Sequence, residues 1–98
     1  MINKKNVFIS GATSGIGKSC AYVFASNHYN LIITGRRMDR LITLKKALVD
    51  EFAINVCTLC FDVTDLQQTQ QAIASIDKNI FPTIDLLINN AGLASGMS

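Results

Sequence analysis

The chain has 98 residues, 49% of them hydrophobic and 16% charged, and a formal net charge of +2 at pH 7. This composition is typical of one globular domain and excludes a disordered chain. The small net charge, with no basic stripe between aromatic residues, argues against nucleic acid and the membrane as partners. No stretch approaches the roughly 20 apolar residues of a membrane span, and no signal-peptide core follows Met1, so a cytoplasmic protein is expected.

The three cysteines and the single histidine predict no metal or catalytic site. Cys57 and Cys60 have CxxC spacing, but residues three apart in a strand point to opposite faces, and no second ligand pair accompanies them. With Cys20 they make an odd number in a chain without a secretion signal, so structural thiols are expected and not disulfides. His28 falls near a predicted helix end without an obvious catalytic partner.

The first predicted strand, Asn6 to Ser10, leads into the sequence Gly-Ala-Thr-Ser-Gly-Ile-Gly and then a helix with an apolar face. Glycines at these positions allow a tight turn, close approach of the backbone to phosphate, and close packing of the helix on its strand. A helix start also presents free backbone N–H groups to an anion. The segment therefore predicts a site for the pyrophosphate of a dinucleotide, held by Gly11, Ser14, Gly15, Ile16 and Gly17.

The second predicted strand, Asn30 to Thr34, is followed by Gly35, Arg36 and Arg37. In dinucleotide-binding folds an acidic residue at this point binds the ribose of NAD, whereas arginine accommodates the 2′-phosphate of NADP. The planar guanidinium suits phosphate oxygens, so the pair predicts a preference for NADP. The alternative is a solvated pair at a helix start, where positive charge is disfavoured without an anion.

Helices and strands continue to alternate along the rest of the chain. A third strand is predicted over 54–60 and a fourth over 84–89, and Thr64 with Gln67 fits a capping box for the third helix. The predicted apolar helix faces are Ile16, Cys20, Val23 and Phe24 in the first helix, Leu41, Leu44, Leu48 and Phe52 in the second, and Leu66, Ile73 and Ile76 in the third.

This alternation predicts the α/β class: a Rossmann-type, doubly wound parallel sheet, present in part, with strand order 3-2-1-4. The ligand is expected above the carboxyl ends of the strands, at the crevice between strands 1 and 4. No strand follows the fourth one, so the apolar segment 84–89 is expected to form an exposed sheet edge.

The four segments that end the strands together resemble the short-chain dehydrogenase/reductase family, in its order and spacing and over almost the whole chain. Thr34-Gly35-Arg36-Arg37 and Asn89-Asn90-Ala91-Gly92-Leu93-Ala94 look most like its NADP-dependent branch that oxidises 3-hydroxy acids and serine. The resemblance implies NADP(H) as cofactor and, in a full-length form, an alcohol or hydroxy-acid substrate and a homo-oligomer. Ser10 stands where the family usually has threonine.

The resemblance also implies roles for residues after the third and fourth strands. Asp62 would receive the adenine amino group and Val63 would line the adenine pocket, although Asp62 could instead be a turn residue before the Thr64 cap. The segment Asn89, Asn90, Ala91 and Gly92 would brace the sheet and touch the adenosine ribose.

The chain departs from the family in its catalytic residues. Family catalysis uses tyrosine and lysine at YxxxK spacing, with a serine and an asparagine, whereas Tyr22 is followed four positions later by Ser26, and Tyr29 by Ile33. No catalytic residue is therefore predicted. Residues 1–98 are expected to form the N-terminal, NADP-binding half of a Rossmann-fold domain, truncated before the catalytic segment and inactive alone.

Two alternatives stay open from the sequence. One is a non-catalytic remnant that binds NADP weakly or not at all. The other is a P-loop NTPase, because Ala12 to Ser19 fits a relaxed Walker A pattern in which Lys18 and Ser19 would serve phosphate and magnesium. Alanine at position 12 weakens that phosphate cradle, and the arginine pair has no role in an NTPase.

Overall fold

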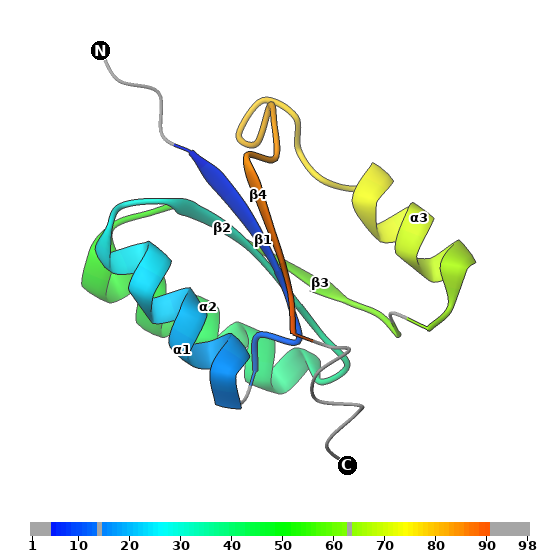
Figure 1. Cartoon of the computed structure of the whole chain (residues 1–98), viewed down its shortest axis with the longest axis horizontal. Coiled ribbons are helices and arrows are strands. Elements are labelled where there is room, and N and C mark those ends of the chain that lie inside the picture. Colours follow the sequence, from blue (N-terminus) through cyan, green and yellow to red (C-terminus); the bar gives the residue numbers. More distant parts are fainter. Residues whose placement is uncertain (1–4, 14, 63, 91–98) are drawn as a thin grey trace.

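The computed structural model describes residues 5–13, 15–62 and 64–90 (Figure 1). Four parallel strands form one sheet in the order β3-β2-β1-β4, which confirms the predicted fold class and strand order. No helix in these ranges is long and apolar enough to cross a membrane. In chain order the elements are β1 (Asn6–Ser10), α1 (Gly15–Ser26), β2 (Asn30–Gly35), α2 (Met38–Phe52), β3 (Val56–Cys60), α3 (Leu66–Ala74) and β4 (Leu86–Asn89).

Helices cover both faces of the sheet, with α1 and α2 on one face and α3 on the other (Figure 1). Side chains alternate between two cores, as period-2 strand geometry requires. Val7 and Ile9 of β1 enter the core under α1 and α2, whereas Phe8 between them enters the core on the α3 face. The apolar face predicted for α2 is confirmed, with Leu41, Leu44 and Leu48 buried and Phe52 packed against them.

The apolar face predicted for α1 is wrong for two of its four residues. Ile16 is 59% exposed and Val23 is 57% exposed, and the residues that face the sheet are small ones. They are small because α1 packs very closely on the preceding turn: a Cβ added at Gly17 would overlap the Gly11 carbonyl oxygen. The buried residues of α1 are Gly17, Ala21 and Ala25.

The third helix also differs from its prediction. None of its nine residues is buried, and Leu66 is 70% exposed, while Ile76 lies buried just beyond the helix end. The N-cap is Asp65 and not Thr64: its Oδ1 accepts from the Gln68 backbone N–H at 3.1 Å, and its Oδ2 from the Gln68 amide at 3.2 Å. The predicted capping box is therefore displaced by one residue, with the same three-residue spacing.

The strand β4 begins at Leu86, two residues later than predicted. Residues 83–85 are instead used to fix the start of β1, because the Asn6 backbone N–H donates to Asp85 Oδ2 and its side chain to the Thr83 carbonyl, both at 2.8 Å. In a similar way β3 begins at Val56, after a left-handed residue, Ala53, at the end of α2. Both strands begin later than predicted because of the preceding turns, whose geometry cannot be predicted from the pattern of apolar residues.

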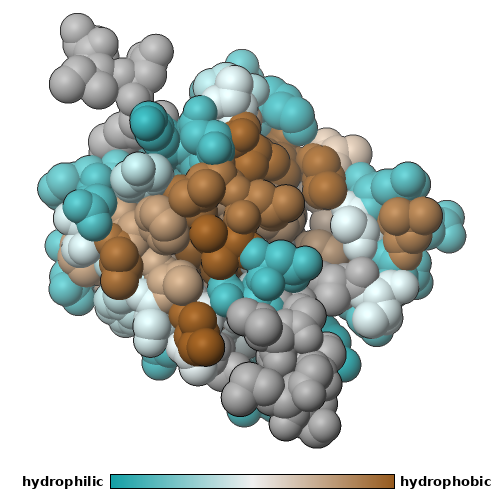
Figure 2. Space-filling view, in the orientation of Figure 1, coloured by the Kyte–Doolittle hydropathy of each residue, from teal (hydrophilic) through white to brown (hydrophobic). Residues whose placement is uncertain are grey.

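The strand β4 lies at one edge of the sheet, as expected, and it is the most exposed of the four strands. Leu86 is 40% exposed and Leu87 is 64% exposed. Figure 2 shows apolar side chains gathered at the centre of this face, where β4 runs in Figure 1. An apolar strand edge that no strand covers among the described residues favours association.

Candidate functional site

The carboxyl ends of the four strands are tied together by single backbone hydrogen bonds. Ala12 N–H donates to the Thr34 carbonyl at 3.0 Å, Phe61 N–H to Gly35 at 3.1 Å, and Asn90 N–H to Ser10 at 3.2 Å. The segments that follow β1, β2, β3 and β4 therefore begin side by side, where the carboxyl ends of the strands lie. Sequence alone separates these segments by dozens of residues, and the parallel topology brings them together.

The glycine turn after β1 has the backbone geometry that glycine allows. Gly11 and Gly15 have φ angles of 65° and 57°, in the left-handed region. A Cβ at Gly15 would meet no atom within 4 Å, so the turn faces open space at the start of α1. The first N–H groups of α1, at Gly15 and Ile16, have no acceptor within the helix and can bind an anion there. Ser14, a further predicted donor, lies outside the described residues.

The two arginines after β2 differ in their contacts. Arg37 pairs with Asp39 through Nη2 and Oδ2 at 3.2 Å and through Nε and Oδ1 at 3.3 Å, and this pairing holds the pKa of the Asp39 carboxyl below its ordinary value. Arg36 is exposed and forms no ion pair within the described residues. Gly35, just before it, lies against the glycine turn, since an added Cβ would be 3.1 Å from the Thr13 methyl group.

Asp62, after β3, takes part in a turn. Its Oδ1 accepts hydrogen bonds from the Thr64 hydroxyl at 2.7 Å and the Thr64 backbone N–H at 3.0 Å. These bonds, and the positive charge of Arg36, lower the pKa of the Asp62 carboxyl. Asp62 is thus both a turn residue and a neighbour of the Arg36 charge. Val63, predicted to line an adenine pocket, lies outside the described residues.

The two asparagines at the end of β4 have different environments. Asn89 Oδ1 accepts from the Ser10 hydroxyl at 2.8 Å, which fixes β4 to β1 at this edge. Asn90 is buried, and its side-chain Nδ2 has no hydrogen-bond partner among the described residues. The predicted site residues Ala91 and Gly92 lie outside those residues. The bond between Ser10 and Asn89 was not foreseen, because nothing in either motif points to the other.

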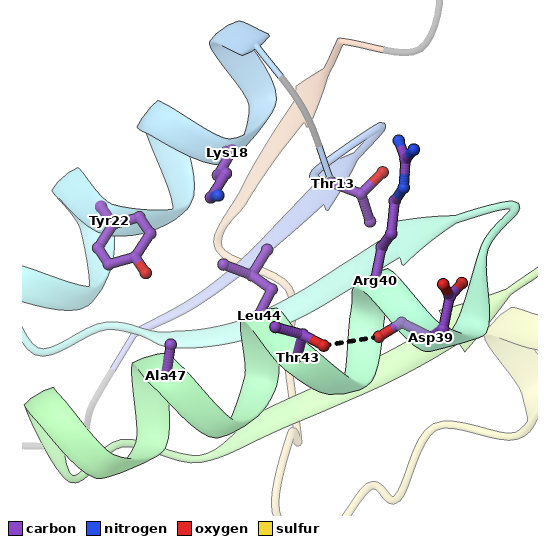
Figure 3. Close-up of a pocket in the computed structure, with 8 residues that line it drawn as sticks. All are labelled: Thr13, Lys18, Tyr22, Asp39, Arg40, Thr43, Leu44 and Ala47. Carbon is purple, nitrogen blue, oxygen red and sulfur yellow. Dashed lines mark hydrogen bonds between the residues drawn. The ribbon is translucent and has the colours of Figure 1, made fainter.

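Lys18, the residue that would serve phosphate in a P-loop, is the fourth residue of α1 and points into the space between α1 and α2 (Figure 3). It contributes to that space with residues of α2 and does not lie over the turn.

The two cysteines of the CxxC spacing have different environments. Burial raises the pKa of the Cys57 thiol, while Cys60 is exposed. Within residues 5–13, 15–62 and 64–90 no group of three His, Cys, Asp or Glu residues could hold a metal ion.

Known proteins are similar to this chain in sequence and in fold. The model of the short chain dehydrogenase family matches residues 5–98. The chain is 41% identical over 96 residues to the NADP-dependent 3-hydroxy acid dehydrogenase of Schizosaccharomyces pombe, covering 97% of this chain and 37% of that protein. It is also 41% identical over 88 residues to the sulfoacetaldehyde reductase of Chromohalobacter salexigens, covering 90% and 34%. It therefore spans about a third of the length of these relatives.

Solved structures give the same result. The alcohol dehydrogenase of Thermococcus sibiricus, complexed with 5-hydroxy-NADP, superposes with a TM-score of 0.81 at 26% identity, over 87% of this chain and 36% of that one. The L-sorbose reductase of Gluconobacter frateurii, complexed with NADPH and L-sorbose, gives 0.80 at 28%, over 88% and 32%. On the family match and the shared fold, the chain belongs to the short-chain dehydrogenase family.

Proposed function

We propose that this chain is the NADP-binding part of an oxidoreductase that acts on an alcohol or hydroxy acid. The observation that carries the proposal is Arg36, an exposed cation at the end of β2, directly after Gly35, which packs against Thr13 of the glycine turn. A turn built for pyrophosphate and a guanidinium beside it together match a dinucleotide with an additional phosphate. The relative from Schizosaccharomyces pombe is named as NADP-dependent, which supports this choice.

The residues at the carboxyl edge fit such a cofactor. Open space lies beside Gly15, and a side chain at that position would occupy part of it. The buried Nδ2 of Asn90 has no partner among the described residues and can donate to a ligand at the end of β4. Arg36 supplies a positive charge that no carboxylate in the described ranges neutralises by an ion pair. These are the donors and the cation that a polar, anionic ligand requires.

Each predicted site residue has a role in this proposal. The first N–H groups of α1 bind the pyrophosphate, with the Ser14 hydroxyl, and Arg36 binds the 2′-phosphate, with Arg37 contributing once its bond to Asp39 opens. Asp62 receives the adenine amino group through Oδ2, since Oδ1 is occupied by Thr64. Further proposed contacts come from Val63 to the adenine, and from Asn89, Ala91 and Gly92 to the ribose.

The described tyrosines do not provide the acid that this chemistry needs. Tyr22, in the middle of α1, packs edge-on against Phe52 at the end of α2. Tyr29 packs against Phe24 and lies just before β2, at the opposite end of the strands from the glycine turn. Hydride transfer to a carbonyl needs a proton donor at the reacting oxygen. We therefore expect NADP binding without dehydrogenase turnover from residues 1–98, and activity only in a longer protein. The homo-oligomer and the cytoplasmic location remain predictions from the sequence.

Isothermal titration with NADP and with NAD tests the proposal, because the two cofactors differ only in the 2′-phosphate. We expect NADP to bind at least about tenfold more tightly, which is the discrimination that one charge-assisted contact provides. Equal affinities would remove the role of Arg36. Binding of neither cofactor by a chain that folds, as judged by circular dichroism, would leave the non-catalytic remnant as the better description.

A further inference from the structure

An open cavity of about 360 Å³ lies between the helices α1 and α2, beside the proposed cofactor site (Figure 3). It lies between the two helices, outside the sheet, and Leu44 forms its apolar base. Pockets of a few hundred cubic ångströms are the size that small molecules occupy. The polar residues that line it are Thr13, Lys18, Tyr22, Asp39, Arg40 and Thr43.

The charges on this cavity do not cancel. Lys18 from α1 and Arg40 from α2 both line it, and neither forms an ion pair within the described part of the chain. The one carboxylate in the lining, Asp39, is paired with Arg37, and Figure 3 shows it at the Arg40 end, away from Lys18. The cavity therefore has a net positive charge contributed by two separate helices, which favours an anionic ligand.

The hydroxyls and the cations of the lining together indicate which kind of anion would fit the cavity. The Thr43 hydroxyl donates to the Asp39 carbonyl at 3.0 Å, so its single proton is used. Thr13 and Tyr22 add hydroxyls from the glycine turn and from α1. Arginine presents a planar fork and lysine a compact charge, a combination that suits the several oxygens of a phosphate group better than one carboxylate.

We propose that this cavity is a binding site for a phosphate monoester, with Lys18 and Arg40 as its cations. The volume exceeds that of a phosphate group, so part of the attached sugar or other small group enters as well. The ligand is a free phosphorylated small molecule and not the 2′-phosphate of NADP, because Arg36, which is proposed to bind that phosphate, does not line this cavity.

The test is a titration of the uniformly ¹⁵N-labelled chain with inorganic phosphate and with ribose 5-phosphate, at constant ionic strength maintained with chloride. We expect saturable amide shifts centred on Thr13, Lys18 and Arg40, and tighter binding of the sugar phosphate. Lys18→Gln and Arg40→Gln should each weaken binding about tenfold. Lys45→Gln is the matched control: it removes a charge from α2 near Cys57, outside the cavity, and should change the affinity less than twofold.

Two results would overturn the proposal. One is shifts that do not saturate and spread over all the lysines, which indicates an adventitious ion only. The other is an equal loss of affinity in Lys45→Gln and Lys18→Gln. Either result leaves the cofactor proposal intact if NADP still binds.

Repeating the titration with each cofactor at saturation separates this site from the cofactor site. If ribose 5-phosphate still binds with either cofactor present, the cavity is an independent site for a free phosphorylated ligand. If NADP blocks ribose 5-phosphate and NAD does not, the phosphate site belongs to the cofactor and the proposal of a separate site is wrong. Neither outcome depends on dehydrogenase activity.

Discussion

The guanidinium of Arg37 donates two hydrogen bonds to the carboxylate of Asp39, and its neighbour Arg36 forms no comparable pair within the described residues. The two arginines look equivalent in the sequence, yet among the described residues only Arg37 forms an ion pair, while Arg36 acts on the Asp62 carboxyl by its charge without pairing with it. Both members of the pair are well exposed, so the pair contributes little to stability and can open for a ligand. Arg36 is therefore the cation available first to an anion at the end of β2.

Reversing the charge at Arg36 should separate the two cofactors. We expect Arg36→Asp to weaken NADP binding by roughly 2 kcal/mol or more, because a charge-assisted contact is lost and repulsion is added. NAD binding should change much less. Two further variants remove the charge of each arginine without reversing it. Arg36→Ala should weaken NADP binding more than Arg37→Ala, as measured by isothermal titration. If NADP and NAD weaken alike, Arg36 acts on folding and not on the 2′-phosphate.

Gly17 should be the glycine of α1 that tolerates a side chain least. An added Cβ would overlap the Gly11 carbonyl oxygen, so α1 would have to move off the turn. We expect Gly17→Ala to lower the free energy of unfolding by about 2 kcal/mol, the cost of overpacking a close contact. Urea denaturation measures this, and Ser19→Ala, at an exposed position of the same helix, is the control. An unchanged midpoint in Gly17→Ala would mean that the close approach is not required.

The sequence predicted the sheet well because strand identity depends on long apolar runs and turn glycines, which it records directly. It failed on the face of α1 because the contact with the sheet uses Gly17, Ala21 and Ala25. Small residues carry little hydrophobic signal, so the large side chains Ile16 and Val23 indicated the wrong face. Leucines mark the buried face of α2, and there the same method worked.

The local geometry of the candidate site could be predicted only in part, for a related reason. Glycine spacing and the arginines after β2 were visible as local motifs. The engagement of Arg37 by Asp39 could have been anticipated from the Arg-x-Asp spacing at a helix start, but which arginine it selects depends on side-chain geometry. The choice of Asp65 over Thr64 as N-cap depends on Asp62, whose carboxylate accepts from the Thr64 hydroxyl.

The hydroxyl of Thr64 should set the acid titration of Asp62. Because this bond lowers the Asp62 pKa below its ordinary value of 3.8, its stabilising contribution is present above that pH and is lost as the pH falls through the lowered value. Thr64→Val removes the hydroxyl and keeps the backbone bond, so the Asp62 pKa should rise toward 3.8. A carboxyl ¹³C titration measures this shift. Thr69→Val, whose hydroxyl bonds the Asp65 carbonyl, should leave the Asp62 titration in place.

The exposed edge of β4 should make the 98-residue chain self-associate. Leu87 is 64% exposed on β4, which pairs with β1 on one side and with no other strand among the described residues. Proteins commonly place charged residues on such edges to prevent pairing with a further strand. We expect sedimentation velocity to show dimers or larger species, and Leu87→Lys to shift them toward monomer. Ile73→Lys makes a comparable change on α3, where the side chain is 41% exposed and away from the edge, and should have little effect. A parent chain that sediments as a monomer at high concentration would show that the edge is protected in another way, and equal effects of the two lysine variants would assign the association to net charge instead of strand pairing.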